Sequence, residues 1–328
     1  MDPSSTLFVI LYARREERTP ALNPEAIVFD RHGELRSGWR MLLFIGLLIV
    51  LLLMVSVPLV LLKVATDFSV KALGVVVIGV ASYLMTRFIN HKPFTAIGLS
   101  LHPAALSGFG MGCLLGFLMV AGVFAVEYLA GYVDLRWGGL SASASLWVLL
   151  LGCVYFLVGA VFEELIFRGY LFQTLMQAVT FLPAMLVMAT LFAIAHGRNP
   201  NVTAFGLVNV SLAAVWLSFA YLKSRSLWLP IGLHFSWNFS QTTLFSFPTS
   251  GISFDGRSLA SLVQSGPVWL TGGAFGPEGG ALATLALIIC TWYILKSKTL
   301  AVPDGIVTLD SSEDLLMAGV AGPERGSQ

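Results

Sequence analysis

The stretch Phe162-Glu163-Glu164-Leu165-Ile166-Phe167-Arg168 places three formal charges inside an otherwise apolar run from Leu146 to Phe172. On insertion scales, one charged side chain at the centre of a bilayer helix costs about 2.5–3.5 kcal/mol. Three unpaired charges would therefore cost roughly 8–10 kcal/mol, which few helices can offset. We expect these side chains either to form a structural ion pair or to belong to a catalytic site.

The composition indicates that the chain lies in a membrane. Hydrophobic residues make up 56% of its 328 residues and charged residues 11%, whereas a soluble domain averages about 25% charged residues. The formal net charge of +1 gives no basis for a nucleic-acid partner. The three cysteines lie in apolar runs and predict neither a disulfide framework nor a cysteine-rich metal site.

The apolar runs predict an all-α polytopic membrane protein of about eight transmembrane helices. The expected spans are Met41–Leu62, Ala72–Phe88, Leu106–Leu129, Leu146–Phe172, Leu182–Ala195, Val202–Leu222, Leu227–Phe245 and Ala281–Leu295. In the third span, Gly108, Gly112 and Gly116 recur every four residues, which predicts close packing against a neighbouring helix. Glu127, near the end of that span, is expected at the membrane interface without a functional role.

The segments outside the spans predict the domain organisation. Residues 1–40 are expected to form a cytoplasmic tail, residues 41–298 the transmembrane domain, and residues 299–328 a flexible C-terminal tail. Glycine, serine and proline are frequent between residues 246 and 280, which predicts an exposed loop. The distribution of basic residues favours an integral, multi-pass protein of a bacterial-type plasma membrane with both termini in the cytoplasm.

The charged cluster divides into two parts on a helix. Glu164 and Arg168 are four residues apart and share a face, with the acidic residue first, which is the better order for an ion pair. Glu163 lies about 100° round the helix and has no local partner. A carboxylate without a partner in lipid must face a wet cavity or find a partner on another helix.

Partners for that carboxylate are found in two later spans. His196 ends the fifth span, four residues after Phe192, and His234 shares a face of the seventh with Asn238. The site is therefore expected between helices 4, 5 and 7. A carboxylate near a histidine can polarise a water, and a second histidine with an asparagine can stabilise an oxyanion. Each residue alone is more often a hydrogen bond between membrane helices than a catalyst.

The ordered series Glu163-Glu164-x-x-x-Arg168, Phe192-x-x-x-His196 and His234-x-x-x-Asn238 resembles the CPBP family. That family comprises CAAX prenyl proteases and bacteriocin-processing or Abi-type intramembrane proteins. The resemblance covers about residues 145–245. It implies an all-α intramembrane endopeptidase of the glutamate type, and members of that family process prenylated C-termini, leader peptides or membrane-anchored regulators. We therefore expect a membrane-anchored peptide or protein as the substrate. The sequence shows no cofactor signature, so no cofactor is expected.

The resemblance also implies a role for each residue. Glu163 would be the general base, assisted by His196, and His234 with Asn238 would form the oxyanion site. Glu164 and Arg168 would organise the site.

Three alternatives remain from the sequence. His196, His234 and Glu163 would supply three ligands to zinc and leave one position for water, as in a membrane metallopeptidase. The absence of an H-E-x-x-H helix weakens this hypothesis. A non-catalytic scaffold or immunity-type protein would keep the fold without the chemistry. A transporter would also carry buried charges, but the hydrophobic segments show no inverted repeat.

Overall fold

Long apolar helices dominate the protein. The computed structural model describes residues 24–30, 33–63, 65–137, 139–254, 258–300 and 307–309. The α-helices are α2 (Pro24–Val28), α3 (Ser37–Leu61), α4 (Asp67–Leu84), α5 (Pro103–Leu129), α6 (Ala142–Phe167), α7 (Tyr170–Val179), α8 (Phe181–His196), α9 (Ala204–Ser224), α10 (Trp228–Phe239), α11 (Val268–Thr271) and α12 (Ala281–Lys296). Two π-helical turns, η1 (Met85–Ile89) and η3 (Ser240–Leu244), extend α4 and α10, and three short 3₁₀ turns are η2 (Phe94–Ile97), η4 (Gly273–Phe275) and η5 (Pro277–Gly279).

Each predicted span coincides with one of these helices, so the expected all-α polytopic membrane fold is confirmed. Five helical segments of the described chain are long and apolar enough to cross a membrane: Ser37–Leu61, Asp67–Ile89, Pro103–Leu129, Ala142–Val179 and Ala204–Ser224. Helices α8 and α12 are apolar but shorter, with 16 residues each, and α10 with η3 is similarly short. For these three helices, full crossing of the bilayer stays a prediction, because a perpendicular span needs about 20 residues.

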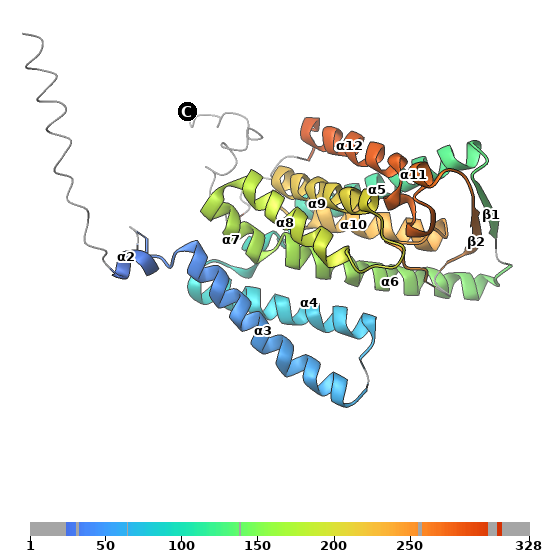
Figure 1. Ribbon diagram of the computed structural model, residues 1–328. Helices are drawn as coiled ribbons and strands as arrows, with labels where there is room; N and C mark the ends of the chain where they lie inside the picture. Colours follow the sequence, from blue (N-terminus) through green and yellow to red (C-terminus); the bar gives the residue numbers. More distant parts are fainter. Residues whose placement is uncertain are drawn as a thin grey trace, which may run out of the picture.

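Helix α10 lies inside the bundle and carries part of the predicted site. It contacts α5, α6 and α9, whereas α3 and α4 form a hairpin on one side of the body (Figure 1). A β-carbon on Gly112 would lie 2.5 Å from the carbonyl oxygen of Leu229, and one on Gly116 would lie 2.6 Å from that of Leu233. The predicted close packing is therefore confirmed at these two glycines. A β-carbon on Gly108 would lie 3.7 Å from the β-carbon of Leu229, which is an ordinary van der Waals distance.

The fourth predicted span is broken, which corrects the expectation of one continuous helix from Leu146 to Phe172. Helix α6 ends at Phe167 and α7 begins at Tyr170. Arg168 leaves the helical conformation with φ −129° and ψ −3°. A β-carbon on Gly169 would lie 2.2 Å from the carbonyl oxygen of Leu165, so glycine permits the sharp turn. The break ends α6 one turn after the glutamate pair.

The segment 246–280 is packed onto the bundle, so the prediction of an exposed loop is wrong. It contains strand β2 (Ala260–Gln264), which pairs antiparallel with β1 (Val133–Trp137). Phe247 and Phe275 are fully buried. Gly276, at φ +91°, lies so close to the carbonyl of Pro248 that a β-carbon would be 2.0 Å from its oxygen. The glycines here allow close backbone contact rather than exposure.

Glu127 is buried inside the protein near the end of α5, and its place at the membrane interface stays a prediction. Its carboxylate accepts a hydrogen bond from Gln264 of β2 at 3.0 Å. The glutamate therefore ties the strand pair to the helix.

Most of the predicted tails lie outside the described residues, at 1–23, 31–32, 301–306 and 310–328. Of the C-terminal segment, Leu309 has a buried side chain, and its carbonyl oxygen accepts hydrogen bonds from Lys92 and Gln177. At least this residue of the predicted flexible tail contacts the bundle.

Candidate functional site

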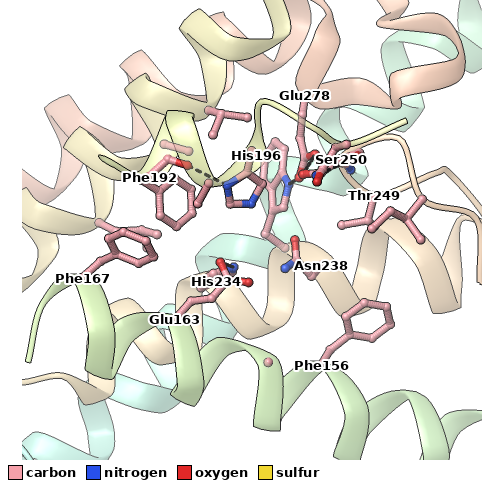
Figure 2. Close-up of a pocket in the computed structure, with 18 of the residues that line it drawn as sticks. Phe156, Glu163, Phe167, Phe192, His196, His234, Asn238, Thr249, Ser250 and Glu278 are labelled. Carbon is pink, nitrogen blue, oxygen red and sulfur yellow. Dashed lines mark hydrogen bonds and ion pairs between the residues drawn. The ribbon is translucent and has the colours of Figure 1, made fainter. Parts of the chain in front are cut away.

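A cavity of about 380 Å³ lies between α6, α8, α9, α10 and the segment 246–280. Its polar wall includes four of the residues that the sequence predicts for the site: Glu163, His196, His234 and Asn238. Figure 2 shows Glu163, His234 and Asn238 on one side and His196 across from them. The structure thus brings these side chains together from three helices that are separated in the sequence.

Glu164 and Arg168 lie behind this wall and form the predicted ion pair. Nη1 of Arg168 is 3.0 Å from Oε1 of Glu164, and both side chains are fully buried. Nη2 of Arg168 donates to the carbonyl oxygen of Ala214 on α9, also at 3.0 Å. Arg168 lies at the carboxyl end of α6, where the partial negative charge of the helix dipole stabilises a cation. The pair therefore joins α6 to α9 beneath the cavity.

The same carboxylate orients His234. Nδ1 of His234 is 2.8 Å from Oε1 of Glu164 and donates its proton there, since a carboxylate can only accept. This contact between side chains 70 residues apart was not predicted from the sequence. It fixes the imidazole so that Nε2 faces the cavity.

Glu163 is the glutamate that remains available. One of its oxygens, Oε2, lies 3.8 Å from Nε2 of His234, which is beyond hydrogen-bond distance. That oxygen makes no hydrogen bond in the described part of the chain. The nearest imidazole is thus His234, whereas the sequence pointed to His196.

His196 presents one nitrogen to the cavity. Its Nδ1 donates to the carbonyl oxygen of Phe192 at 2.8 Å, and its ring packs on the Phe192 ring with centroids 4.5 Å apart. Because the carbonyl can only accept, the neutral ring carries its proton on Nδ1 and a lone pair on Nε2. His196 is therefore arranged to accept a proton or a hydrogen bond at Nε2.

Asn238 lies on the cavity wall one turn after His234, and its side-chain amide has no hydrogen-bond partner among the described residues. Its amide is free to donate to a bound group. His234 and Asn238 share a face of α10, as the spacing predicted.

The cavity also contains a carboxylate that the sequence did not single out. Glu278, in the turn η5, accepts hydrogen bonds from the backbone N–H and hydroxyl of Ser250, at 2.6 and 2.5 Å, and from the Trp237 indole at 3.2 Å. Burial raises the pKa of the Glu278 carboxyl, while these donors and the charge of His196 oppose the rise. The glutamate was missed because it lies in the segment predicted to be exposed.

The arrangement does not offer a three-ligand metal site. Over the described ranges, no group of three or more His, Cys, Asp or Glu side chains has the geometry needed to hold a metal ion. Nδ1 of His196 and Nδ1 of His234 are both engaged in hydrogen bonds, so each ring would have only Nε2 for a ligand. The zinc hypothesis thus gains no support from the positions of the side chains.

Fold and site together define an integral membrane protein of the all-α polytopic class. Its helices enclose a cavity with a largely apolar lining, into which two imidazoles, the carboxylate of Glu163 and the amide of Asn238 are brought together.

Comparison with known proteins shows a family resemblance over part of the chain. Residues 145–240 match the family described as type II CAAX prenyl endopeptidase Rce1-like. These residues include all six predicted site residues, and the resemblance to the CPBP family is confirmed over this segment. At the family level, the match supports a CAAX-protease-like, membrane-embedded endopeptidase. The uncharacterized protein YyaK of Bacillus subtilis (strain 168) is 25% identical over 229 residues, which are 66% of this chain and 72% of that protein. No solved structure matches the chain.

Proposed function

We propose that the protein hydrolyses a peptide bond of a membrane-anchored peptide or protein, with water activated by Glu163 and His196. The observation that supports this proposal is that the two neighbouring glutamates have different hydrogen-bond partners. Glu164 is engaged by Arg168 and His234, whereas Glu163 lines the cavity and its Oε2 has no hydrogen-bond partner among the described residues. A carboxylate left free beside a cavity is suited to general-base catalysis.

In the proposed reaction, a water lies between the carboxylate of Glu163 and Nε2 of His196. As its oxygen attacks the scissile carbonyl carbon, one proton passes to Glu163. When the C–N bond breaks, Glu163 returns that proton to the leaving amine. The other proton of the water passes to Nε2 of His196 as the new carboxyl group ionises, and is released to solvent afterwards.

The negative charge on the carbonyl oxygen would be stabilised by His234 and Asn238. With Nδ1 donated to Glu164, His234 offers a second N–H at Nε2 when the ring is protonated. That form balances the charges of the cluster, because Glu163, Glu164, Arg168 and an imidazolium sum to zero. Preorganised donors of this kind in a cavity that excludes bulk water stabilise an oxyanion without reorganisation.

The test uses the purified full-length protein in lipid vesicles with a fluorogenic farnesylated C-a-a-X peptide as the probe, because the matched family is described as prenyl endopeptidases. The native protein should cleave the probe. Glu163→Gln should lower kcat by about 10²–10⁴ while its thermal unfolding midpoint stays near that of the native protein. Glu34→Gln, on the exposed segment before α3, is the control and should keep full activity.

Two outcomes would contradict the proposal. If Glu163→Gln cleaved the probe as well as the native protein, the carboxylate would not be the base. If the native protein left the probe intact, we would compare membrane peptides that accumulate on Glu163→Gln and on the native protein. The absence of any peptide enriched on the variant would favour the non-catalytic scaffold.

A further inference from the structure

Glu278 occupies a fixed position on the cavity wall. Among the described residues, the three hydrogen-bond partners of its carboxylate are all donors: the N–H and hydroxyl of Ser250 and the indole N–H of Trp237. Three donors and no acceptor are the surroundings of an ionised carboxylate. Trp237 precedes Asn238 on α10, so Glu278 also contacts the helix that carries two of the predicted site residues.

The backbone around Glu278 is anchored as firmly as its side chain. Asn209 of α9 donates to the carbonyl oxygens of Glu278 and Gly280, at 2.8 and 2.9 Å. Thr284 of α12 donates in turn to the Asn209 side chain at 2.7 Å. The turn η5 is thus tied to two helices, and the carboxylate has little freedom to move.

This carboxylate and His196 influence each other through the cavity. Both side chains line it, and Figure 2 shows Glu278 and Ser250 beside His196. The charge of His196 is one of the effects that oppose the rise in the pKa of Glu278 caused by burial. By linkage, the anionic form of Glu278 and the protonated form of His196 therefore support each other.

Other charged groups also face His196. Glu163 approaches from α6 and His234 from α10, and Arg198 follows in the exposed connection to α9. Glu163 is assigned to the attacking water and His234 lies between two carboxylates. Asp67 and Lys71 of α4 also line the cavity and pair with each other at 3.3 Å. Neither Asp67 nor Glu278 is used in a step of the proposed reaction, and of the two Glu278 is the one beside His196 in Figure 2.

We propose that Glu278 is a positioning residue for His196, whose anchored carboxylate stabilises the imidazolium formed when Nε2 takes a proton during hydrolysis. The proposal rests on the function proposed above. Glu278 would act as a buried carboxylate near a catalytic histidine does: the carboxylate stabilises the charged ring and does not itself take the proton. The ring is already oriented by Phe192, so the contribution of Glu278 is its charge.

The test compares Glu278→Gln, which removes the charge, with Glu278→Asp, which keeps it. In the peptide assay, Glu278→Gln should lower kcat about tenfold with a smaller change in KM, and the acid limb of the rate profile should move about one pH unit lower. Glu278→Asp should keep the acid limb in place. Glu34→Gln, which removes a carboxylate on the exposed segment before α3, is the control and should leave the acid limb in place.

A second measurement does not depend on cleavage. In protein labelled with ¹⁵N-histidine, the titration of His196 among the five histidines is followed by NMR and assigned with His196→Asn. Its midpoint should fall by about one pH unit in Glu278→Gln and stay unchanged in Glu278→Asp. An unchanged midpoint in Glu278→Gln would overturn the proposal, whatever the activity. A shifted midpoint in a protein that cleaves nothing would instead contradict the proposed function and leave the pairing intact.

If Glu278→Gln does not fold, the proposal is tested with His196→Asn, which removes the other member of the pair. In His196→Asn, the carboxyl band of Glu278 in infrared difference spectra should titrate at higher pH than in the native protein, because the stabilising imidazolium is gone. The same titration in both proteins would overturn the proposal.

Discussion

Oε1 of Glu164 accepts hydrogen bonds from both Arg168 and His234, at 3.0 and 2.8 Å. One oxygen thus connects an ion pair within α6 to an imidazole on α10. The ion pair lowers the cost of burying the charges, and the imidazole is turned so that Nε2 faces the cavity. Glu164 is therefore a structural and an orienting residue together, and its neighbour Glu163 is left for the water.

Removal of Arg168 should destabilise the fold as well as the site. Arg168→Ala would leave Glu164 as a buried carboxylate with one donor and would remove the bond from α6 to the carbonyl of Ala214 on α9. Breaking a buried pair by removing one partner costs about 3–5 kcal/mol. We expect a marked loss of monodisperse protein in size-exclusion chromatography and a lower unfolding midpoint.

The control for that prediction removes both charges. Glu164→Gln combined with Arg168→Met should recover more folded protein than Arg168→Ala, because no unpaired charge stays buried. Its activity should stay low, since His234 has lost its anionic partner. Normal abundance and normal activity of Arg168→Ala would show that the pair is dispensable.

The contact between α5 and α10 gives a second prediction. A β-carbon on Gly112 or Gly116 would lie 2.5–2.6 Å from a carbonyl oxygen of α10, so the helices must move apart to admit it. Overpacking of this kind costs about 1–3 kcal/mol. Gly116→Ala should therefore lower the unfolding midpoint and also the activity, because α10 carries His234 and Asn238.

The same helix provides the matched controls. Gly110 and Gly122 have open space where a β-carbon would be built. Gly110→Ala and Gly122→Ala should leave both the midpoint and the activity near the native values. Equal effects of all four substitutions would mean that helix propensity, and not the contact with α10, determines the result.

The sequence predicted what depends on local spacing. Run lengths located the spans, and separations of four residues correctly placed Glu164 beside Arg168 and Phe192 beside His196. The bond between Glu164 and His234 joins helices that are distant in sequence, so no periodicity reveals it. The break at Gly169 depends on a backbone contact with Leu165 that apolar content does not report.

The segment 246–280 was misread for a physical reason. Glycine is typical both of exposed turns and of places where two backbones meet closely. At Gly251, for example, φ is +80° and a β-carbon would lie 1.8 Å from the carbonyl oxygen of Pro200. The glycine content of a single sequence does not distinguish exposed turns from close backbone contacts. Glu278 lies in this segment and was therefore not predicted as a site residue.

Asn238 gives a third prediction. If its amide stabilises the oxyanion, Asn238→Ala should reduce kcat by about 10²–10³ with little change in KM, since the interaction forms only in the transition state. Asn199→Ala is the control, because the amide of Asn199 lines the same cavity but already donates to the carbonyl of Ser250 at 3.0 Å. A rise in KM alone for Asn238→Ala would assign the residue to substrate binding.

A fourth prediction addresses the zinc hypothesis. No group of three His, Cys, Asp or Glu side chains in the described residues has the geometry needed to hold a metal ion. Cleavage of the peptide probe should therefore persist after dialysis against a strong chelator. Activity that disappears on dialysis and returns with zinc would replace the metal-free mechanism with a metallopeptidase.

The pH dependence of stability gives a fifth prediction. Burial raises the pKa of Glu278 above its ordinary value of 4.5. At a pH between 4.5 and the raised pKa of the folded protein, the folded protein therefore binds more protons than the unfolded chain. Stability must then fall as the pH rises through that window. We compare the thermal unfolding midpoints of the native protein and of Glu278→Gln at the same pH and scan rate. The difference, native minus variant, should decrease as the pH rises above 4.5 and then level off. The lost hydrogen bonds add an offset that does not vary with pH, so only the slope is diagnostic. A difference that increases with pH would mean that the donors around Glu278 outweigh its burial.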